Sequence, residues 1–448
     1  MSDQQREQKI EQVPEDLAER STMTKAEKTE ANSSIAEEKE KIRRFKRKLA
    51  GLKRPLRFIH WGETSEYARD LSLLLEDIRT SVRDPLTGVQ LVAAFFEADE
   101  DILGHCDDSS GHVGDLFRYN GRDLFLAYAS RCSDWEKEAV ADILLELNLK
   151  NDYGVRDLLV DCAGECLDEP VIRRMIAEFQ RRANAEKNKD KKERHLMLVE
   201  SLARQIRDAE LFEKTRTISW GKLSTAAFID IAEVWLAGGN VEKAHFWIKK
   251  IPEGDNFLAD ERDSLLLEIY RREGDREKLI ELLYRKFRDF RSSERLQALL
   301  EVLGKEKRDE VIDQETARIL ENTSFRVSDA EFLLASGKIG EAAGYIVRNS
   351  EQLDGREYER LPPLAEQMES KGRSLAAGLI YRSLLSSILD RACAKAYSHA
   401  ARYLRKLDAL SDDISDWQGL QDHETFTEQL YLHHGRKKSF WSEYEVRR

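Results

Sequence analysis

The sequence is poor in residues that break helices and in patterns that build sheets. Only 7 of its 448 residues are proline, and long runs that alternate Val, Ile or Thr with polar residues are missing. Few prolines permit continuous helices, because proline removes a backbone donor and kinks a helix. The missing alternation argues against half-buried strands. With 35% charged and 41% hydrophobic residues, the composition predicts an all-α protein with charged outer faces.

Membrane, export and disulfide signals are also missing. No apolar run approaches the ~18 residues that span a bilayer, and the first residues, MSDQQREQKIEQ, lack the apolar core of a signal peptide. A net charge of −12 gives no global attraction to nucleic acid or anionic lipid. We therefore expect a cytoplasmic protein without membrane contact. Reducing conditions fit the five scattered cysteines, Cys106, Cys132, Cys162, Cys166 and Cys393.

A helical pattern recurs in the second half of the chain. Residues 228–251, FIDIAEVWLAGGNVEKAHFWIKKI, contain apolar residues at helical spacing on both sides of Gly239. A shift of 35 residues places Trp235 and Gly239 on Tyr270 and Gly274. The period, with an aromatic residue four positions before the glycine, resembles the tetratricopeptide repeat. The turn glycines are Gly239, Gly274, Gly304, Gly337 and Gly372.

This periodicity predicts an α-solenoid of stacked antiparallel helical hairpins over residues 191–410. Trp235 is expected to be buried between hairpins, and each turn glycine to lie between two helices, where a left-handed residue is needed. The copy around Gly304 lacks the alanine and the aromatic residue, so its register is uncertain. An ordinary helical bundle with chance periodicity is the alternative.

The remaining segments suggest a domain order. Residues 1–40 read as a disordered polar and acidic tail, and residues 411–448 as a capping segment. Residues 41–190 read as an N-terminal helical domain without a defensible repeat. The charged stretch 181–194 is expected to be a boundary or an exposed loop. Asp84 and Asp168 are expected N-caps, and the helices predicted in this domain cover 64–83, 85–103, 112–131, 134–149 and 168–184.

The segment Lys41–Arg57 carries nine basic residues and no acidic one. It could dock onto a phosphate-bearing partner, nucleic acid included. It could also be a first helix whose apolar residues, at a regular helical spacing, pack inward while its charges stay in water. The apolar stripe is Ile42, Phe45, Leu49 and Leu52, and the candidate partner-binding residues are Arg43, Arg44, Lys46 and Arg47.

Two further clusters could bind metal. The turn from His105 to Asp115 holds two His, one Cys and three Asp in eleven residues, but its spacing matches no zinc or calcium loop. We expect a structural turn in which Asp107, Asp108 and Asp115 act, the first two by satisfying backbone N–H groups. Cys162 and Cys166 would share one helical face; buried thiols are the better explanation than a metal half-site.

The C-terminal stretch HHGRKKSFW, residues 433–441, combines histidine, basic and aromatic residues. Arg436 and Lys437 could grip an anionic group of a partner. A terminal helix that caps the solenoid explains Phe440 and Trp441 equally well. No Walker loop, GxSxG elbow or HExxH pattern occurs. We therefore expect no catalytic residue, no cofactor and no metal.

Several blocks together resemble a known family. They are RFIHWGE, EDILGHCDDSSGHVGDLFR, NDYGVRDLLVD and the long stretch from Ser398 to Trp441. Over residues 41–441 they resemble an uncharacterised bacterial family of tetratricopeptide-like helical proteins, a domain of unknown function. The resemblance implies a helical solenoid and supplies no activity or cofactor.

The sequence leaves two main functions open. The first is a non-enzymatic scaffold that binds a protein partner on a concave helical surface. The alternative is a nucleic-acid-associated module that uses the basic segment Lys41–Arg57 together with the basic cluster Lys187–Arg194. The acidic net charge argues against the alternative unless these two clusters lie side by side. A catalytic role comes third.

Overall fold

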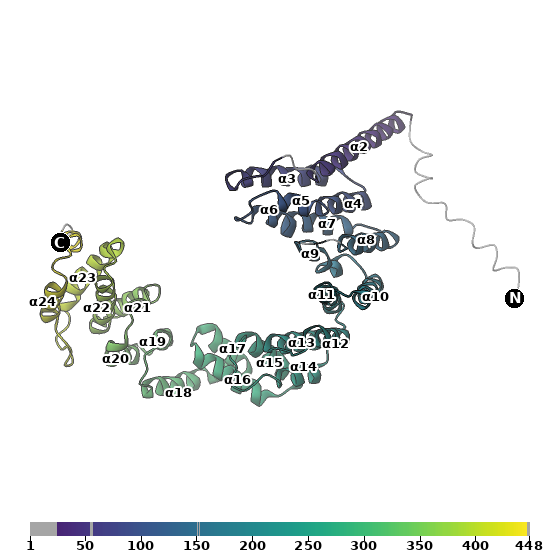
Figure 1. Cartoon of the computed structure of the whole chain (residues 1–448). Coiled ribbons are helices and arrows are strands. Elements are labelled where there is room, and N and C mark those ends of the chain that lie inside the picture. Colours follow the sequence, from purple (N-terminus) through teal and green to yellow (C-terminus); the bar gives the residue numbers. More distant parts are fainter. Residues whose placement is uncertain (1–24, 54–56, 150, 152, 446–448) are drawn as a thin grey trace. The chain divides into compact units, whose positions relative to one another are not determined.

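The computed structural model describes residues 25–53, 57–149, 151 and 153–445, and within them the chain is all-α (Figure 1). The β-type pairing there is one isolated bridge between Ile59 and Cys106. The chain divides into two compact units, one ending at Arg262 and the other beginning at Asp263, inside helix α15 (Ala259–Glu273). The predicted fold class is confirmed. None of the described helices is long and apolar enough to cross a membrane.

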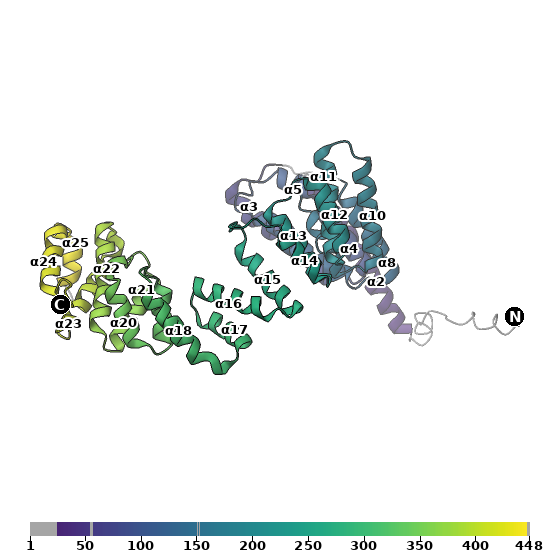
Figure 2. The ribbon, with the colours of Figure 1, turned by 90° about the horizontal axis from the view of Figure 1, so that it is seen from below.

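The first unit contains short and long helices that pack as neighbours along the chain. In Figure 2, for example, α10 and α11 lie side by side. The elements before α15 are α2 (Lys25–Leu52), α3 (Trp61–Ser81), α4 (Pro85–Phe96), α5 (Asp99–Gly104), α6 (His112–Asp115), the π-helix η2 (Leu116–Gly121), α7 (Arg122–Ala129), α8 (Asp134–Leu147), α9 (Asp157–Val160), η3 (Ala163–Glu165), α10 (Glu169–Ala185), α11 (Lys189–Gln205), α12 (Ala209–Trp220), α13 (Thr225–Ala237) and α14 (Val241–Ile248).

The second unit continues the succession of helices. Helices α19 and α20, α21 and α22, and α22 and α23 are packed pairs. Its elements after α15 are α16 (Arg276–Asp289), α17 (Ser293–Leu303), η4 (Lys305–Lys307), α18 (Arg308–Glu321), α19 (Val327–Ala335), α20 (Ile339–Arg348), η5 (Ser350–Gln352), α21 (Leu361–Ser370), α22 (Ser374–Asp390), η6 (Ala394–Ala396), α23 (Tyr397–Ser411), α24 (His423–His434) and α25 (Lys438–Glu445).

The repeat turns share one backbone geometry. Gly239, Gly274, Gly337 and Gly372 each lie between consecutive helices with a positive φ of 66–87°. In each turn the residue after the glycine donates its N–H to the carbonyl four residues before the glycine, at 2.9–3.0 Å. This six-to-one bond defines the Schellman helix ending, which favours glycine at the left-handed position. The prediction that these glycines separate helices is confirmed.

Two turns repeat this geometry without glycine. Arg207 and Ala392 have φ of 57° and 51°, and the residue after each makes the same six-to-one bond, to Ala203 and to Ile388. Gly304 differs: its φ is 111° and ψ 135°, and the short helix η4 starts directly after it. The same helix ending therefore also occurs without glycine, whereas the turn at Gly304 departs from it.

The structure corrects several segment predictions. Residues 25–40, predicted to be disordered, belong to α2; residues 1–24 lie outside the described residues. Lys, Glu and Ala are strong helix formers, and they are frequent in 25–40. The stretch 181–194 is not a loop: only residues 186–188 separate α10 from α11.

The predicted helix caps and the predicted continuous helices are confirmed only in part. Asp84 caps α4 by accepting from the Thr87 N–H at 2.8 Å, as predicted. Asp168 does precede α10, but its side chain makes no cap bond and pairs with Lys137 at 3.0 Å. The predicted helix 85–103 is interrupted between α4 and α5, and the predicted helix 112–131 contains a π-helical segment.

Trp235 is only half-buried, so its predicted place in the core is wrong. Its indole N–H donates to Glu213 at 2.6 Å, and the indole of the buried Trp247 donates to the same carboxylate oxygen at 2.9 Å. The Lys243 ammonium lies 5.6 Å from the Trp235 ring centre. The Trp235 ring therefore lies between a carboxylate and an ammonium group at the edge of the hairpin, where its polar N–H is satisfied without full burial of the ring.

Candidate partner-binding groove

A buried cluster of charges joins three elements of the second unit. Arg291, in the loop after α16, donates to Glu315 of α18 and to Asp329 of α19, both at 2.8 Å. The three side chains are 1–3% exposed. Charges removed from water this completely are stable only when paired and hydrogen-bonded. The cluster therefore fixes the positions of α18 and α19 relative to the end of α16.

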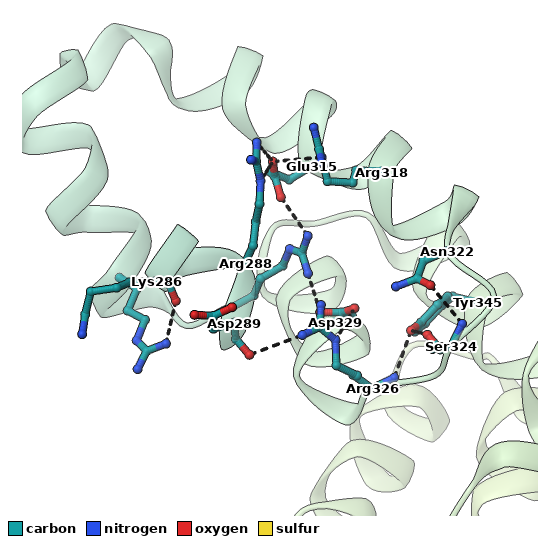
Figure 3. A network of polar contacts seen from close by, with 12 residues as sticks. Lys286, Arg288, Asp289, Glu315, Arg318, Asn322, Ser324, Arg326, Asp329 and Tyr345 are labelled. Carbon is teal, nitrogen blue, oxygen red and sulfur yellow. Dashed lines mark hydrogen bonds and ion pairs between the residues drawn. The ribbon is translucent and has the colours of Figure 1, made fainter. Parts of the chain in front are cut away.

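Other arginines surround the same carboxylates (Figure 3). Arg288 contacts Glu315 at 2.8 Å, and the more exposed Arg318 lies 3.7 Å from the same carboxylate. Arg326 lies 3.4 Å from Asp329. Burial alone would raise the pKa of Glu315, but hydrogen bonds from Arg288 and Arg291 outweigh it and lower the pKa below its ordinary 4.5. Ionised Glu315 therefore stabilises the fold at pH values above its ordinary pKa. This stabilisation is lost as the pH falls through the lowered pKa of the folded state.

The loop between α18 and α19 is held by a buried tyrosine. The hydroxyl of Tyr345 donates to the Ser324 carbonyl at 2.9 Å and accepts from the Arg326 N–H at 3.0 Å. Asn322 accepts from the Ser324 N–H at 3.1 Å, so the loop has several backbone groups satisfied (Figure 3). The start of α19 is therefore held by Tyr345, through the loop before it, and by Arg291, through Asp329.

A groove of about 580 Å³ lies beside this network, between α17 and α19. Its apolar lining consists of a half-exposed phenylalanine, Phe290, buried side chains of both helices, and the exposed Ala335. We call this the α17–α19 groove. Its complete lining is Phe290, Arg291, Ser292, Ser293, Glu294, Leu296, Gln297, Leu300, Lys305, Arg308, Glu331, Phe332, Ala335 and Ser336.

Charged groups of both signs surround the apolar part. Lys305 and Arg308 are exposed at the η4–α18 end. Arg360 pairs with Glu331, and its guanidinium also lies 5.3 Å from the Phe290 ring centre. Arg295 approaches the same ring at 5.6 Å. The groove thus combines apolar anchoring area with polar groups that can orient a ligand, which is the usual composition of a binding site.

The lining contains no histidine or cysteine, the side chains that most often act as general base or nucleophile near neutral pH. Across the described part of the chain, no group of three or more His, Cys, Asp or Glu side chains is placed to hold a metal ion.

The basic residues that the sequence singled out on α2 lie elsewhere, in the first unit. Phe45 and Leu49 are buried, and Ile42 and Leu52 pack against the same core, so the packed-helix interpretation is confirmed. Arg43 and Arg47 both pair with the exposed Glu40, at 3.5 and 3.1 Å. The remaining candidates, Arg44 and Lys46, are exposed and make no ion pair with a described residue.

The two C-terminal candidates differ from each other. Arg436 is exposed, whereas Lys437 is half-buried and donates to the Leu389 carbonyl at the end of α22, at 2.8 Å. A lysine at that position satisfies one of the carbonyls that a helix end leaves without a partner. Phe440 is fully buried and Trp441 half-buried against the core of the unit, in agreement with the capping interpretation.

In the His105–Asp115 turn, Asp107 and Asp108 satisfy backbone N–H groups as predicted, whereas Asp115 does not. Asp108 accepts from the N–H groups of Val113 and Gly114, at 2.9 and 2.8 Å, through its two carboxylate oxygens. Asp107 accepts from the Ser109 N–H at 3.2 Å. Asp115 makes only a long, exposed ion pair with Arg118 at 3.5 Å. Asp108 is thus the residue that satisfies the start of α6.

We predict that Asp108→Ala lowers the free energy of unfolding by about 0.5–2 kcal/mol, because two N–H groups lose their acceptor. The matched control, Asp115→Ala, removes a carboxylate from the same turn and is expected to change stability by less than about 0.5 kcal/mol. Thermal unfolding of both variants measures the difference. Equal losses would show that Asp108 has no special role.

The sequence predicted that Cys162 and Cys166 share one face of a helix, and this prediction is wrong. Cys162 precedes and Cys166 follows the short 3-10 helix η3. Cys166 is buried, and burial raises the pKa of its thiol to about 12; burial also raises the pKa of Cys162. Both thiols therefore stay protonated and behave as small apolar groups.

The α17–α19 groove is not predicted by the sequence, because its apolar residues have the same spacing as ordinary core residues. A usable signal was present in the irregular copy around Gly304, whose spacing from Gly274 is shorter than the other intervals. The groove lies where the repeat is irregular.

Comparison with known proteins identifies a family but no activity. A family model described as "Family of unknown function (DUF6880)" matches residues 19–229 and again residues 177–443. No curated protein matches the chain. Among solved structures, the chain is similar to a "Circular tandem repeat protein with novel repeat topology and enhanced subunit contact surfaces", at 16% identity over 86% of each chain. The TM-score of 0.12 is too low to carry any argument.

Proposed function

Because the chain belongs to the family of unknown function DUF6880, we propose its role from its own surface: it is a non-enzymatic helical-repeat scaffold that binds a segment of a protein partner. The observation that carries the proposal is the α17–α19 groove, an apolar depression with charged groups of both signs around it. On this proposal the protein works in the cytoplasm, without a cofactor.

The rigidity of the site supports this role. Its two walls are α17 and α19. The buried ion pairs of Arg291, just before α17, with Glu315 of α18 and Asp329 of α19 hold these helices in place. A groove that is fixed before binding loses little conformational entropy when a ligand enters. Stacked helical hairpins typically use such surfaces to hold helical or extended segments of other proteins.

The half-exposed Phe290 and exposed Ala335 supply the contact area. Aromatic side chains contribute strongly at interfaces because they bury much area for few rotatable bonds. Lys305 and Arg308 would orient acidic residues of the bound segment. Rim charges of this kind act mainly on the association rate and on specificity.

We predict that Ala335→Trp blocks the groove, because a large ring replaces an exposed methyl group in its lining. The probe is a phage-displayed library of random peptides of about 12 residues, selected on the wild-type chain. Selected peptides are expected to bind the variant at least about tenfold more weakly, a difference of ~1.4 kcal/mol. Fluorescence anisotropy with the purified full chain measures the affinities.

The control is Ala237→Trp. Ala237 occupies the matching position of an earlier hairpin, two residues before Gly239 as Ala335 is two before Gly337, and is exposed as well. This variant is expected to bind the peptides as the wild type does. The proposal would be abandoned if no peptide is selected, or if both tryptophan variants bind equally well.

Nucleic-acid binding is the second candidate, favoured by the exposed Lys41, Arg44 and Lys46 on α2, which make no ion pair with a described residue. Five other basic residues of this segment already make ion pairs, among them Lys53 with Glu97 at 2.6 Å and Arg57 with Glu63 at 2.7 Å. A phosphate-binding surface would show steep salt dependence and lose affinity in Arg44→Glu. Anisotropy with a labelled duplex distinguishes the two functions.

A further inference from the structure

Helix α24 presents apolar side chains outward. Of its twelve residues only Leu430 is buried, whereas Tyr431 is 64% and Leu432 80% exposed. Tyr431 stands edge-on to the half-buried Trp441 of α25, with ring centres 5.3 Å apart. A groove of about 450 Å³ lies between this surface and the middle of α23, lined also by Leu404, Thr427, Glu428 and Tyr444.

The charges around these apolar residues are separated by sign. The first half of α24 carries exposed Glu424 and Glu428, and the residues after its C-terminal end include exposed Arg436 and Lys438. None of these four side chains makes an ion pair with a described residue. At helical spacing, Glu424, Glu428 and Tyr431 share one outward stripe, with Leu432 beside it.

We propose that this stripe is a self-association surface, on which α24 packs antiparallel against α24 of a second copy of the chain. A twofold axis near Leu432 would place Glu428 opposite Arg436 of the second copy, and the reverse pair would form on the other side. Such an arrangement is isologous, because each copy contributes the same acidic half, apolar centre and basic end. Because the stripe is acidic at one end and basic at the other, a second copy in antiparallel orientation matches its charges.

The expected strength is modest. Twelve residues give a stripe about 18 Å long, which is short for a permanent interface. We expect a reversible dimer with a dissociation constant on the order of micromolar. The inference is independent of the proposed function, since the stripe and the α17–α19 groove share no residue.

Sedimentation velocity of the full chain, from about 1 to 200 μM, tests the inference. The wild type is expected to shift from monomer to dimer with concentration. Glu428→Arg and Arg436→Glu are each expected to raise the dissociation constant at least about tenfold, because each places like charges opposite one another twice per dimer. The double variant Glu428→Arg with Arg436→Glu restores opposite charges and should recover most of the affinity.

Leu432→Asp removes the apolar centre and should leave the chain monomeric. Because Leu432 is 80% exposed, this change does not endanger the fold. Trp135→Asp, at a 72% exposed tryptophan of α8, is the control and should dimerise as the wild type does. A wild type that stays monomeric throughout would overturn the inference, and so would a double variant no better than the single ones.

Discussion

Replacing Arg291 with methionine is expected to destabilise the region around α16–α19 by about 3–5 kcal/mol. The change keeps much of the side-chain volume but leaves Glu315 and Asp329, each 1% exposed, without their shared cation. Removing one partner of a buried ion pair costs up to this much. Both carboxylates lose their most buried cation, and they keep only Arg288, at 2.8 Å from Glu315, and the more distant Arg326, at 3.4 Å from Asp329. Hydrogen exchange followed by mass spectrometry localises the loss to peptides of α18 and α19.

Arg318→Met is the matched control. Arg318 faces the same Glu315 at 3.7 Å, but its side chain is 59% exposed. An exposed pair contributes only about 0–1 kcal/mol, so exchange should change little. If Arg291→Met and Arg318→Met change the exchange of α18 and α19 equally, the buried cluster does not stabilise the helices beside the α17–α19 groove.

The second large effect is expected for Phe117→Ala in the first unit. Phe117 is fully buried in the π-helix η2 and stacks on Phe95 with ring centres 4.7 Å apart; Phe96 meets it edge-on at 5.4 Å. Deleting the ring removes buried apolar area and leaves a cavity between two rings that cannot close it. The expected cost is about 3–5 kcal/mol, measured as a lower unfolding temperature of the first unit.

Tyr119→Ala tests whether the effect belongs to the core or to the π-helix itself. Tyr119 lies in the same element and is 55% exposed, so its truncation should change stability by less than about 0.5 kcal/mol. A comparable loss in both variants would show that the π-helical backbone, and not the packed rings, determines stability here.

The sequence predicted the parts of the fold that follow from local backbone chemistry. Gly239, Gly274, Gly337 and Gly372 were found because a left-handed helix ending favours glycine. The equivalent turn at Arg207 carries no such mark, since only its backbone angle of 57° reveals it. This conformation costs an ordinary residue roughly 1 kcal/mol, so propensity alone does not predict it there.

Side-chain roles were predictable where the partner lies nearby in the chain. The bonds of Asp108 to Val113 and Gly114 span five and six residues and follow from the need to satisfy a helix start. Arg291 and Asp329 are 38 residues apart, and no local pattern relates them. The groove that they support therefore became visible only in three dimensions.

Site-specific photo-crosslinking in the cells that produce the protein tests the proposed function most directly. Benzoylphenylalanine replaces Gln297, an exposed residue of the groove lining, or Trp135 of α8 in the first unit as the comparison position. We predict that position 297 captures a defined protein, that the crosslinked peptide of this protein is one continuous segment, and that Ala335→Trp prevents the capture. No crosslink from position 297, or the same proteins captured from both positions, would contradict the assignment of the groove as a partner-binding site.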